Sequence, residues 1–257
     1  MEAPAPCPVC VRRRRWRNRL GNLGFIAGIV LVVYWILPPI ARVREPAARM
    51  ASSNNLKQMA LAMHNYEDNN LHVPGANAPY LDPKDGSKKL PVSWRVLILP
   101  YVEQEVIYQE YRLDEPWDGP SNIRLSDRMP KVYSHPKADL SVLPKGRTHY
   151  RVFASRAGAK PSALFTDGLP GPKFKEIPDG TSNTILIVEA AEAVPWTMPE
   201  VLLYDRNQPL PKLGGLFRGQ FQAALADGSV RSFRSDMPDE KLRAWITKDG
   251  GDLANDE

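Results

Sequence analysis

The longest uninterrupted apolar stretch lies near the N-terminus, where residues 20–41 include no charged side chain. A helix of this length spans about 33 Å, enough to cross the roughly 30 Å hydrocarbon layer of a bilayer. Prolines and arginines at Pro38, Pro39, Arg42 and Arg44 occupy the zone where a signal peptidase requires small residues. The pattern therefore predicts a retained transmembrane helix over 20–41 rather than a cleaved secretory signal.

A second, amphipathic pattern follows over residues 47–66. Its apolar positions recur near the 3.6-residue period of an α-helix, and they are Ala48, Leu56, Met59, Ala60, Met63 and Tyr66. Together the two stretches predict one long N-terminal helix, embedded in the membrane first and amphipathic afterwards, with bends allowed at Pro38-Pro39 and Pro46. The apolar stripe is expected to pack against the rest of its own domain.

The rest of the chain alternates polar, proline-rich loops with short helical and strand patterns. We predict a loop over 68–92, a helix over 93–111 that is broken at Pro100, and a short helix over 122–129. Strands are predicted over 131–134, 149–154, 184–189, 220–225 and 230–233. A closing helix over 238–247, capped by Asp239, completes the series.

The last two predicted strands flank Asp227-Gly228, and an Asp-Gly pair between alternating apolar runs is a strong hairpin signal. Helices come first and strands later, without the regular alternation of strands and helices that builds a parallel sheet. The sequence therefore predicts an α+β fold, in which the long N-terminal helix packs on an antiparallel sheet with long loops.

Charge adds a topology signal at the N-terminus. The formal net charge of +5 arises in residues 1–19, which contain six arginines and one acid, Glu2. The rest of the chain is neutral overall, which argues against nucleic-acid binding. Because basic residues ahead of an apolar helix stay in the cytoplasm, we expect a cytoplasmic tail over 1–19, a single inner-membrane span over 20–41, and a periplasmic, extracytoplasmic domain over 42–257.

Two cysteines, Cys7 and Cys10, lie in the expected cytoplasmic tail as Cys-Pro-Val-Cys. A structural zinc site needs four ligands, and neither a second cysteine pair nor a nearby histidine follows. The missing ligands favour a free thiol pair, and the alternative is a zinc site shared between two chains. The outer domain contains no cysteine, so we expect its core alone to stabilise it.

Segments spread along the chain resemble the signatures of the DUF1559 family, the pilin-like proteins of planctomycetes that are also labelled bacterial substrate-binding protein family 10. The resemblance runs from about Gly24 to Gly251. Its segments are Gly24-Phe25, Arg44–Met50, Ser53–Gln58, Ala62–Tyr66, Ser93–Gln104, Asp114–Asp118, Asp179–Thr184, Val194–Trp196 and Ala226–Val230.

This resemblance implies a pilin-like plan, in which a long helix lies against an antiparallel sheet, and it implies no known activity. It also implies a prepilin-type cleavage junction between Gly24 and Phe25. Two positions depart from the family pattern. Ile29 stands at the fifth position after the junction, where pilin-like precursors carry a glutamate that pairs with a neighbour's N-terminal amine. Phe217 stands ten residues before Asp227, where many relatives have a histidine.

Three carboxylates surround an aromatic residue in the segment Asp114, Glu115, Trp117 and Asp118. Such a cluster can serve acid–base chemistry or bind Ca²⁺ through hard oxygen ligands. The spacing does not match an EF-hand loop, and Asp-Glu-Pro-Trp is also typical of a loop that caps a helix and buries its tryptophan. The structural interpretation is the one we favour.

The segment Asp179–Asn183 contains Ser182 but lacks the Gly-x-Ser-x-Gly pattern of a nucleophile elbow. Its residue types favour a turn, because their short polar side chains bond their own backbone. Glu189 follows at the end of the predicted strand and is expected to be a buried, paired polar residue. The four histidines, His64, His72, His135 and His149, show no metal-ligand spacing.

Two functional hypotheses follow, and neither requires an enzyme, a cofactor or a metal. The first is a pilin-like structural or interaction protein that packs laterally through the helix 24–66, with the lipid bilayer and other pilin-like subunits or itself as partners. The alternative is a membrane-tethered module that binds a small solute or glycan through exposed aromatics such as Trp117 and Trp196. Candidate recognition or structural residues are Asp114, Glu115, Trp117, Asp118, Asp179, Asn183, Glu189, Trp196 and Asp227.

Overall fold

The computed structural model describes residues 44–81, 88–139 and 141–251. The basic tail, the predicted span 20–41, the Gly24-Phe25 junction and both cysteines lie outside these residues. Among the residues that are described, no helix combines the length and apolar character needed to cross a membrane. Ala48–Glu257 form one compact unit, distinct from Met1–Ala47.

The N-terminal helix covers residues 44–70. Leu56, Met59, Ala60 and Met63 are fully buried, so the apolar stripe predicted from the sequence packs inward. The helix extends past the predicted end at residue 66. In its last turn the side chains of Asn69 and Asn70 donate to the carbonyls of Asn65 and Tyr66. It ends at Leu71, whose left-handed backbone (φ 63°) terminates the helical hydrogen bonding.

The main sheet has four antiparallel strands in the order β3-β6-β8-β9. They are β3 (Arg147–Arg151), β6 (Ile185–Pro195), β8 (Gln220–Leu225) and β9 (Val230–Arg234). The predicted hairpin is confirmed: β8 and β9 pair across a turn in which the Asp227 carboxylate accepts from Ser229 N–H at 2.8 Å. Gly228 adopts φ 83° in this turn, a conformation that favours glycine.

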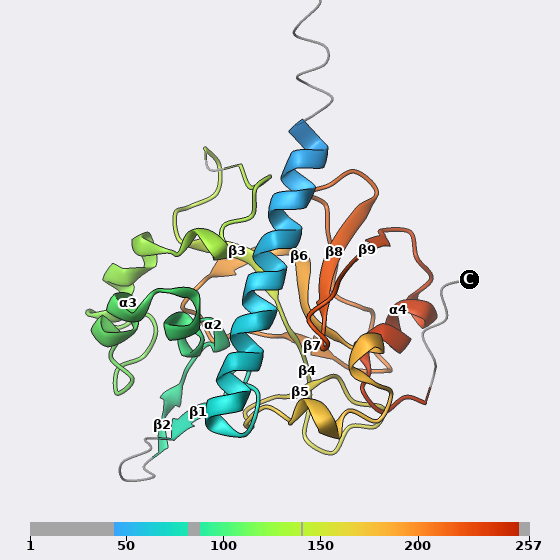
Figure 1. Ribbon diagram of the computed structural model, residues 1–257, viewed down its shortest axis with the longest axis horizontal. Helices are drawn as coiled ribbons and strands as arrows, with labels where there is room; N and C mark the ends of the chain where they lie inside the picture. The colour runs from blue at the N-terminus through green and yellow to red at the C-terminus, as the bar shows by residue number, and fades with distance from the viewer. Residues whose placement is uncertain (1–43, 82–87, 140, 252–257) are drawn as a thin grey trace, which may run out of the picture. The chain divides into compact units, whose positions relative to one another are not determined.

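The two faces of this sheet belong to different apolar clusters. On one face the N-terminal helix packs with Tyr150, Ile187 and Ala224, and Figure 1 shows it crossing in front of the sheet. On the other face Phe221 and Phe233 stack at 5.4 Å, and Trp245 of α4 (Asp239–Ile246) packs edge-on against Phe233. The sheet therefore lies between two layers, and the helix side is the one on which polar residues gather.

A second, three-stranded sheet was not predicted. It has the order β5-β4-β7 and consists of β4 (Phe153–Ser155), β5 (Phe165–Thr166) and β7 (Leu202–Tyr204). Its strands pair in parallel, whereas the sequence suggested antiparallel pairing throughout. The predicted strand 149–154 in fact contributes to both sheets, because it is interrupted between Arg151 and Phe153.

The short elements correct several boundaries. The predicted strand over 131–134 is a 3-10 helix, η3 (Lys131–Tyr133), in which the neighbouring Val132 and Tyr133 are both buried. The predicted loop 68–92 contains the hairpin β1 (Pro79–Leu81) and β2 (Lys88–Pro91). Helix α4 begins after Pro238, and Asp239 lies in its first turn without capping it.

The helical region after Val92 is divided as predicted around Pro100. It consists of α2 (Trp94–Leu97), η1 (Leu99–Val102) and α3 (Glu105–Glu110), followed by η2 (Asn122–Arg128). Two further 3-10 turns are η4 (Phe174–Glu176) and η5 (Thr181–Asn183). Helices together with an antiparallel four-stranded sheet make the fold α+β, which confirms the predicted class.

Candidate functional site

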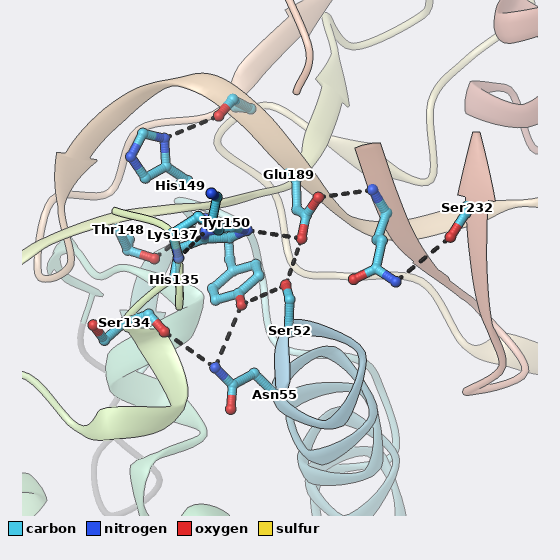
Figure 2. A network of polar contacts seen from close by, with 12 residues as sticks. Ser52, Asn55, Ser134, His135, Lys137, Thr148, His149, Tyr150, Glu189 and Ser232 are labelled. Carbon is cyan, nitrogen blue, oxygen red and sulfur yellow. Dashed lines mark hydrogen bonds and ion pairs between the residues drawn. The ribbon is translucent and has the colours of Figure 1, made fainter. Parts of the chain in front are cut away.

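A buried polar network connects the N-terminal helix to the main sheet, and Glu189 of β6 is at its centre. Both oxygens of the fully buried carboxylate accept hydrogen bonds (Figure 2). Oε1 accepts from the Ser52 hydroxyl and from His135 Nε2 at 3.0 Å, while Oε2 accepts from the backbone N–H of Gln222 at 2.8 Å. Three separate parts of the chain thus converge on one carboxylate.

Tyr150 of β3 extends the network along the helix. Its hydroxyl lies 2.8 Å from Ser52 Oγ, and because the Ser52 proton is directed at Glu189, the tyrosine hydroxyl is the donor. Burial raises the pKa of Tyr150 well above its ordinary value, so this hydroxyl keeps its proton. Asn55 Nδ2 lies 3.4 Å from the same hydroxyl and donates to the Ser134 carbonyl at 3.1 Å.

The hydrogen bonds of His135 define its tautomer. Nδ1 accepts from the backbone N–H of Lys137 at 3.1 Å, so the proton of the neutral ring is on Nε2, which donates to Glu189. In a catalytic triad the imidazole accepts the serine proton. Here the imidazole and Ser52 both donate to the carboxylate, and Ser52, His135 and Glu189 are at most 2% exposed. This geometry suits a polar clamp between helix and sheet, which consists of Ser52, His135, Tyr150 and Glu189.

The buried side chain of Arg95 binds the backbone carbonyl of Tyr150. The guanidinium of Arg95, in α2, donates through Nε and Nη2 to the Tyr150 carbonyl and through Nη1 to Ser93 Oγ at 3.2 Å. Burial, followed by the nearby charge of Arg151, lowers the pKa of Arg95 to about 9. Tyr150 is therefore bound at its hydroxyl by the helix and at its carbonyl by Arg95.

His149 lies beside the network, with its ring 5.9 Å from that of His135 and its Nδ1 3.1 Å from the Ala190 carbonyl. Burial lowers the pKa of His149, while its hydrogen bond to the Ala190 carbonyl and the charge of Glu189 act in the opposite direction and do not outweigh burial. The unfolded chain then binds more protons than the folded one below the ordinary value of 6.5. The contribution of His149 to the free energy of unfolding is therefore complete above pH 6.5 and is lost as the pH falls below it.

We therefore expect His149→Gln to flatten the pH dependence of stability. Glutamine keeps a donor for the Ala190 carbonyl but does not titrate. Urea unfolding midpoints measured between about pH 7.5 and pH 5 should fall less steeply for this variant than for the unmodified chain. His72→Gln, which changes a histidine outside the network, is the control. Equal slopes for His149→Gln and the unmodified chain would contradict the assignment.

A polar groove with a volume of about 430 Å³ lies next to the network, between the helix and the strands β8 and β9. The helix contributes Arg49, Met50, Ser53, Asn54 and Lys57, and the strands contribute Gln220, Gln222, Val230 and Ser232. Gln222 belongs to both features, because its backbone N–H binds Glu189 while its side chain lines the groove. Its Oε1 is buried and has no hydrogen-bond partner among the described residues.

The acidic segment identified in the sequence forms a separate loop. Glu115 accepts from Ser121 N–H at 2.6 Å; burial alone would raise its pKa, but bonds from Ser121 and Asn122 outweigh burial and hold the pKa below its ordinary value. The buried side chain of Asn122 donates to the carbonyls of Arg112, Glu115 and Pro116. Trp117 is half-buried, and Asp114 and Asp118 are exposed. Within the described ranges, no three His, Cys, Asp or Glu side chains are grouped to hold a metal.

The segment Asp179–Asn183 does form a turn, and Asn183 Nδ2 donates to the Asp179 carbonyl at 2.9 Å. The Asp179 carboxylate also accepts from Gly250 N–H at 2.8 Å, so the turn connects to the chain beyond α4. Asp227 N–H donates to the Thr181 carbonyl at 3.0 Å, which joins the β8–β9 turn to the same place. Asp179, Asn183 and Asp227 therefore lie together, but outside the network and the groove.

The expectation that Trp196 is exposed is wrong. The sequence suggested an exposed aromatic that stacks on sugar, but Trp196 is 0% exposed. Its ring stacks on Tyr133 at 5.9 Å, and its Nε1 donates to the Ser126 carbonyl at 3.1 Å. It is a core residue.

Of the candidates named from the sequence, Glu189 alone belongs to the network. Its partners were missed because their types, a serine on a helix, a lone histidine and a strand tyrosine, are individually unremarkable. The interruption of the apolar stripe at Ser52, which is fully buried in line with Leu56 and Met59, is the one local signal that could have found them. The Phe217 ring packs on the His135 ring, with the ring centres 5.1 Å apart.

Residues 41–208 match a family described as "Protein of unknown function (DUF1559)". No curated protein shows significant similarity to the chain, and no solved structure does.

Proposed function

The chain belongs to the DUF1559 family, and we propose that it is a pilin-like structural or interaction protein anchored in the inner membrane by residues 20–41. In this proposal the domain 42–257 lies on the extracytoplasmic side, and the N-terminal helix is the element through which subunits pack laterally. The apolar run, the arginines that precede it and the resemblance to pilin-like proteins support the anchor and its orientation.

One observation carries the packing role: the helix 44–70 is bound to the sheet along one face and presents apolar side chains on another. Ser52, Leu56 and Met59 are fully buried, whereas Met50 is 69% exposed and Leu61 is 61% exposed. The clamp at Glu189 keeps the orientation of the helix relative to the sheet constant. A helix held in this way can present its outer face to a neighbouring subunit.

Crosslinking in membranes tests lateral packing. In a chain carrying Cys7→Ser and Cys10→Ser, Leu61→Cys should form crosslinked dimers with a bismaleimide, because the outer helix face would meet its counterpart. Val142→Cys, which is 80% exposed on a loop, is the control and should remain monomeric. A chain that stays strictly monomeric at Leu61→Cys, in membranes and in detergent, would rule out packing through this face.

A second function, a tethered solute- or glycan-binding module, is favoured by the polar groove alone. The aromatic surface first expected for it loses Trp196, which is buried. The groove between the helix and β8–β9 supplies what a binding site needs instead: a volume of about 430 Å³, in the range of small-molecule sites, and converging polar groups.

A further inference from the structure

The groove exists because the helix covers only part of the sheet. Ser52 binds Glu189 of β6 and Tyr150 of β3, which places the helix over these two strands. Figure 1 shows β8 and β9 beside the helix in this view. The residues of β8 and β9 that line the groove, Gln220, Gln222 and Ser232 with Val230, are mainly polar. This part of the sheet is thus built for polar contacts rather than for an apolar cover.

The charged residues that line the groove favour a negatively charged ligand. The described lining residues include two cations, Arg49 and Lys57, and no Asp or Glu. The guanidinium of Arg49 lies 5.8 Å from the centre of the Phe217 ring. Turning the Gln220 amide over brings its oxygen within hydrogen-bond distance of all three Arg49 nitrogens, at 2.8 Å from Nη2, 2.9 Å from Nη1 and 3.3 Å from Nε. These contacts orient Arg49 in advance, and an oriented guanidinium recognises a carboxylate through paired hydrogen bonds.

The buried amide of Gln222 favours a ligand that carries a hydroxyl group. The residue is 6% exposed, its backbone is held by Glu189, and its Nε2 lies 3.5 Å from Ser232 Oγ. Its Oε1 has no partner within the described structure. A buried polar atom that lacks a hydrogen bond is unfavourable. A ligand hydroxyl can donate a hydrogen bond to an amide oxygen, so it would satisfy this atom.

We infer that the groove binds a hydroxylated carboxylate of the size of one uronic-acid residue, with the carboxylate at Arg49 and Lys57 and a ring hydroxyl at Gln222. The inference rests on the second proposed function, ligand binding, and gives its chemical class. Neither feature suffices alone: a simple anion would leave Gln222 unpaired, and a neutral sugar would not use the two cations.

Calorimetric titration of the full-length chain tests this inference, with D-glucuronate and D-galacturonate as probes and D-glucose and D-galactose as their uncharged counterparts. We expect each uronate to bind at least about tenfold more tightly than its neutral sugar, with an affinity that weakens as salt is added. Lys57→Met should weaken uronate binding by about tenfold. The control Lys175→Met, at an exposed site outside the groove, should change nothing.

Gln222→Leu separates ligand recognition from a structural role. It should weaken uronate binding at least about tenfold without lowering the urea midpoint, because leucine removes the unpaired amide atom. If this variant does not fold, Ser232→Ala provides the same binding test from the adjacent strand. Neutral sugars that bind as tightly as uronates would overturn the charge assignment while leaving a glycan-binding function. Absence of binding by all four sugars would overturn both.

Discussion

Glu189→Ala is expected to reduce the free energy of unfolding by about 4 kcal/mol, because three buried donors lose their common acceptor. The Ser52 hydroxyl, the His135 Nε2–H and the Gln222 backbone N–H all converge on this carboxylate. A buried donor without a partner costs about 1–3 kcal/mol. A loss of this size is a large part of the roughly 5–15 kcal/mol that stabilises a typical domain.

Urea unfolding followed by far-UV circular dichroism measures this effect. Glu192→Ala is the matched control, since Glu192 is the same residue type on the same strand, β6, but is exposed; it should change stability by less than about 0.5 kcal/mol. Glu189→Gln should lie between the two, because its amide retains one acceptor oxygen but turns an NH₂ group towards donors. A loss below about 1 kcal/mol for Glu189→Ala would show that the clamp is not essential to stability.

Trp196→Ala is expected to destabilise the domain by about 3–5 kcal/mol, the range for removing a buried aromatic side chain. The change leaves a cavity beside Tyr133, on which the indole stacks at 5.9 Å. It also leaves the Ser126 carbonyl without its indole donor. Because Tyr133 donates through its hydroxyl to the Arg95 carbonyl, the cavity lies next to the support of the clamp.

Trp117→Ala provides the comparison, because this tryptophan is half-buried in the acidic loop. Its loss should cost less than about 1.5 kcal/mol, since less apolar surface returns to water. Urea unfolding of both variants, followed by circular dichroism so that the lost tryptophan does not alter the signal, gives the difference. Similar losses for the two substitutions would contradict the assignment of Trp196 to the core.

The local sequence pattern predicted a large part of the fold. The 3.6-residue spacing of Leu56, Met59 and Met63 identified the buried face of the helix, since residues three and four apart lie on the same side of an α-helix. The Asp227-Gly228 pair identified the β8–β9 hairpin, because its conformation is decided by the turn residues themselves. Pro100 likewise marked the division between α2 and the helical turns that follow.

Local pattern failed where packing decides between conformations. Residues 131–134 have the apolar content of a strand, yet Val132 and Tyr133 both point into the core as a 3-10 turn. The parallel sheet β5-β4-β7 joins segments whose two- and three-residue strands are too short to show any period. Trp196, which follows a strand, was expected at the surface, and whether it is covered depends on Tyr133 and Ser126, far away in the sequence.

The sequence by itself determined the α+β class, the amphipathic helix, the hairpin and membership of the DUF1559 family, because each depends on residues close together in the chain or on motifs in a constant order. The clamp and the groove were decided by the tertiary structure. Ser52 meets Glu189 across 137 positions and Tyr150 across 98, and no local period encodes contacts of that separation. The side chains come together because the apolar helix face packs on the sheet, and the polar residues within that face must then find partners out of water.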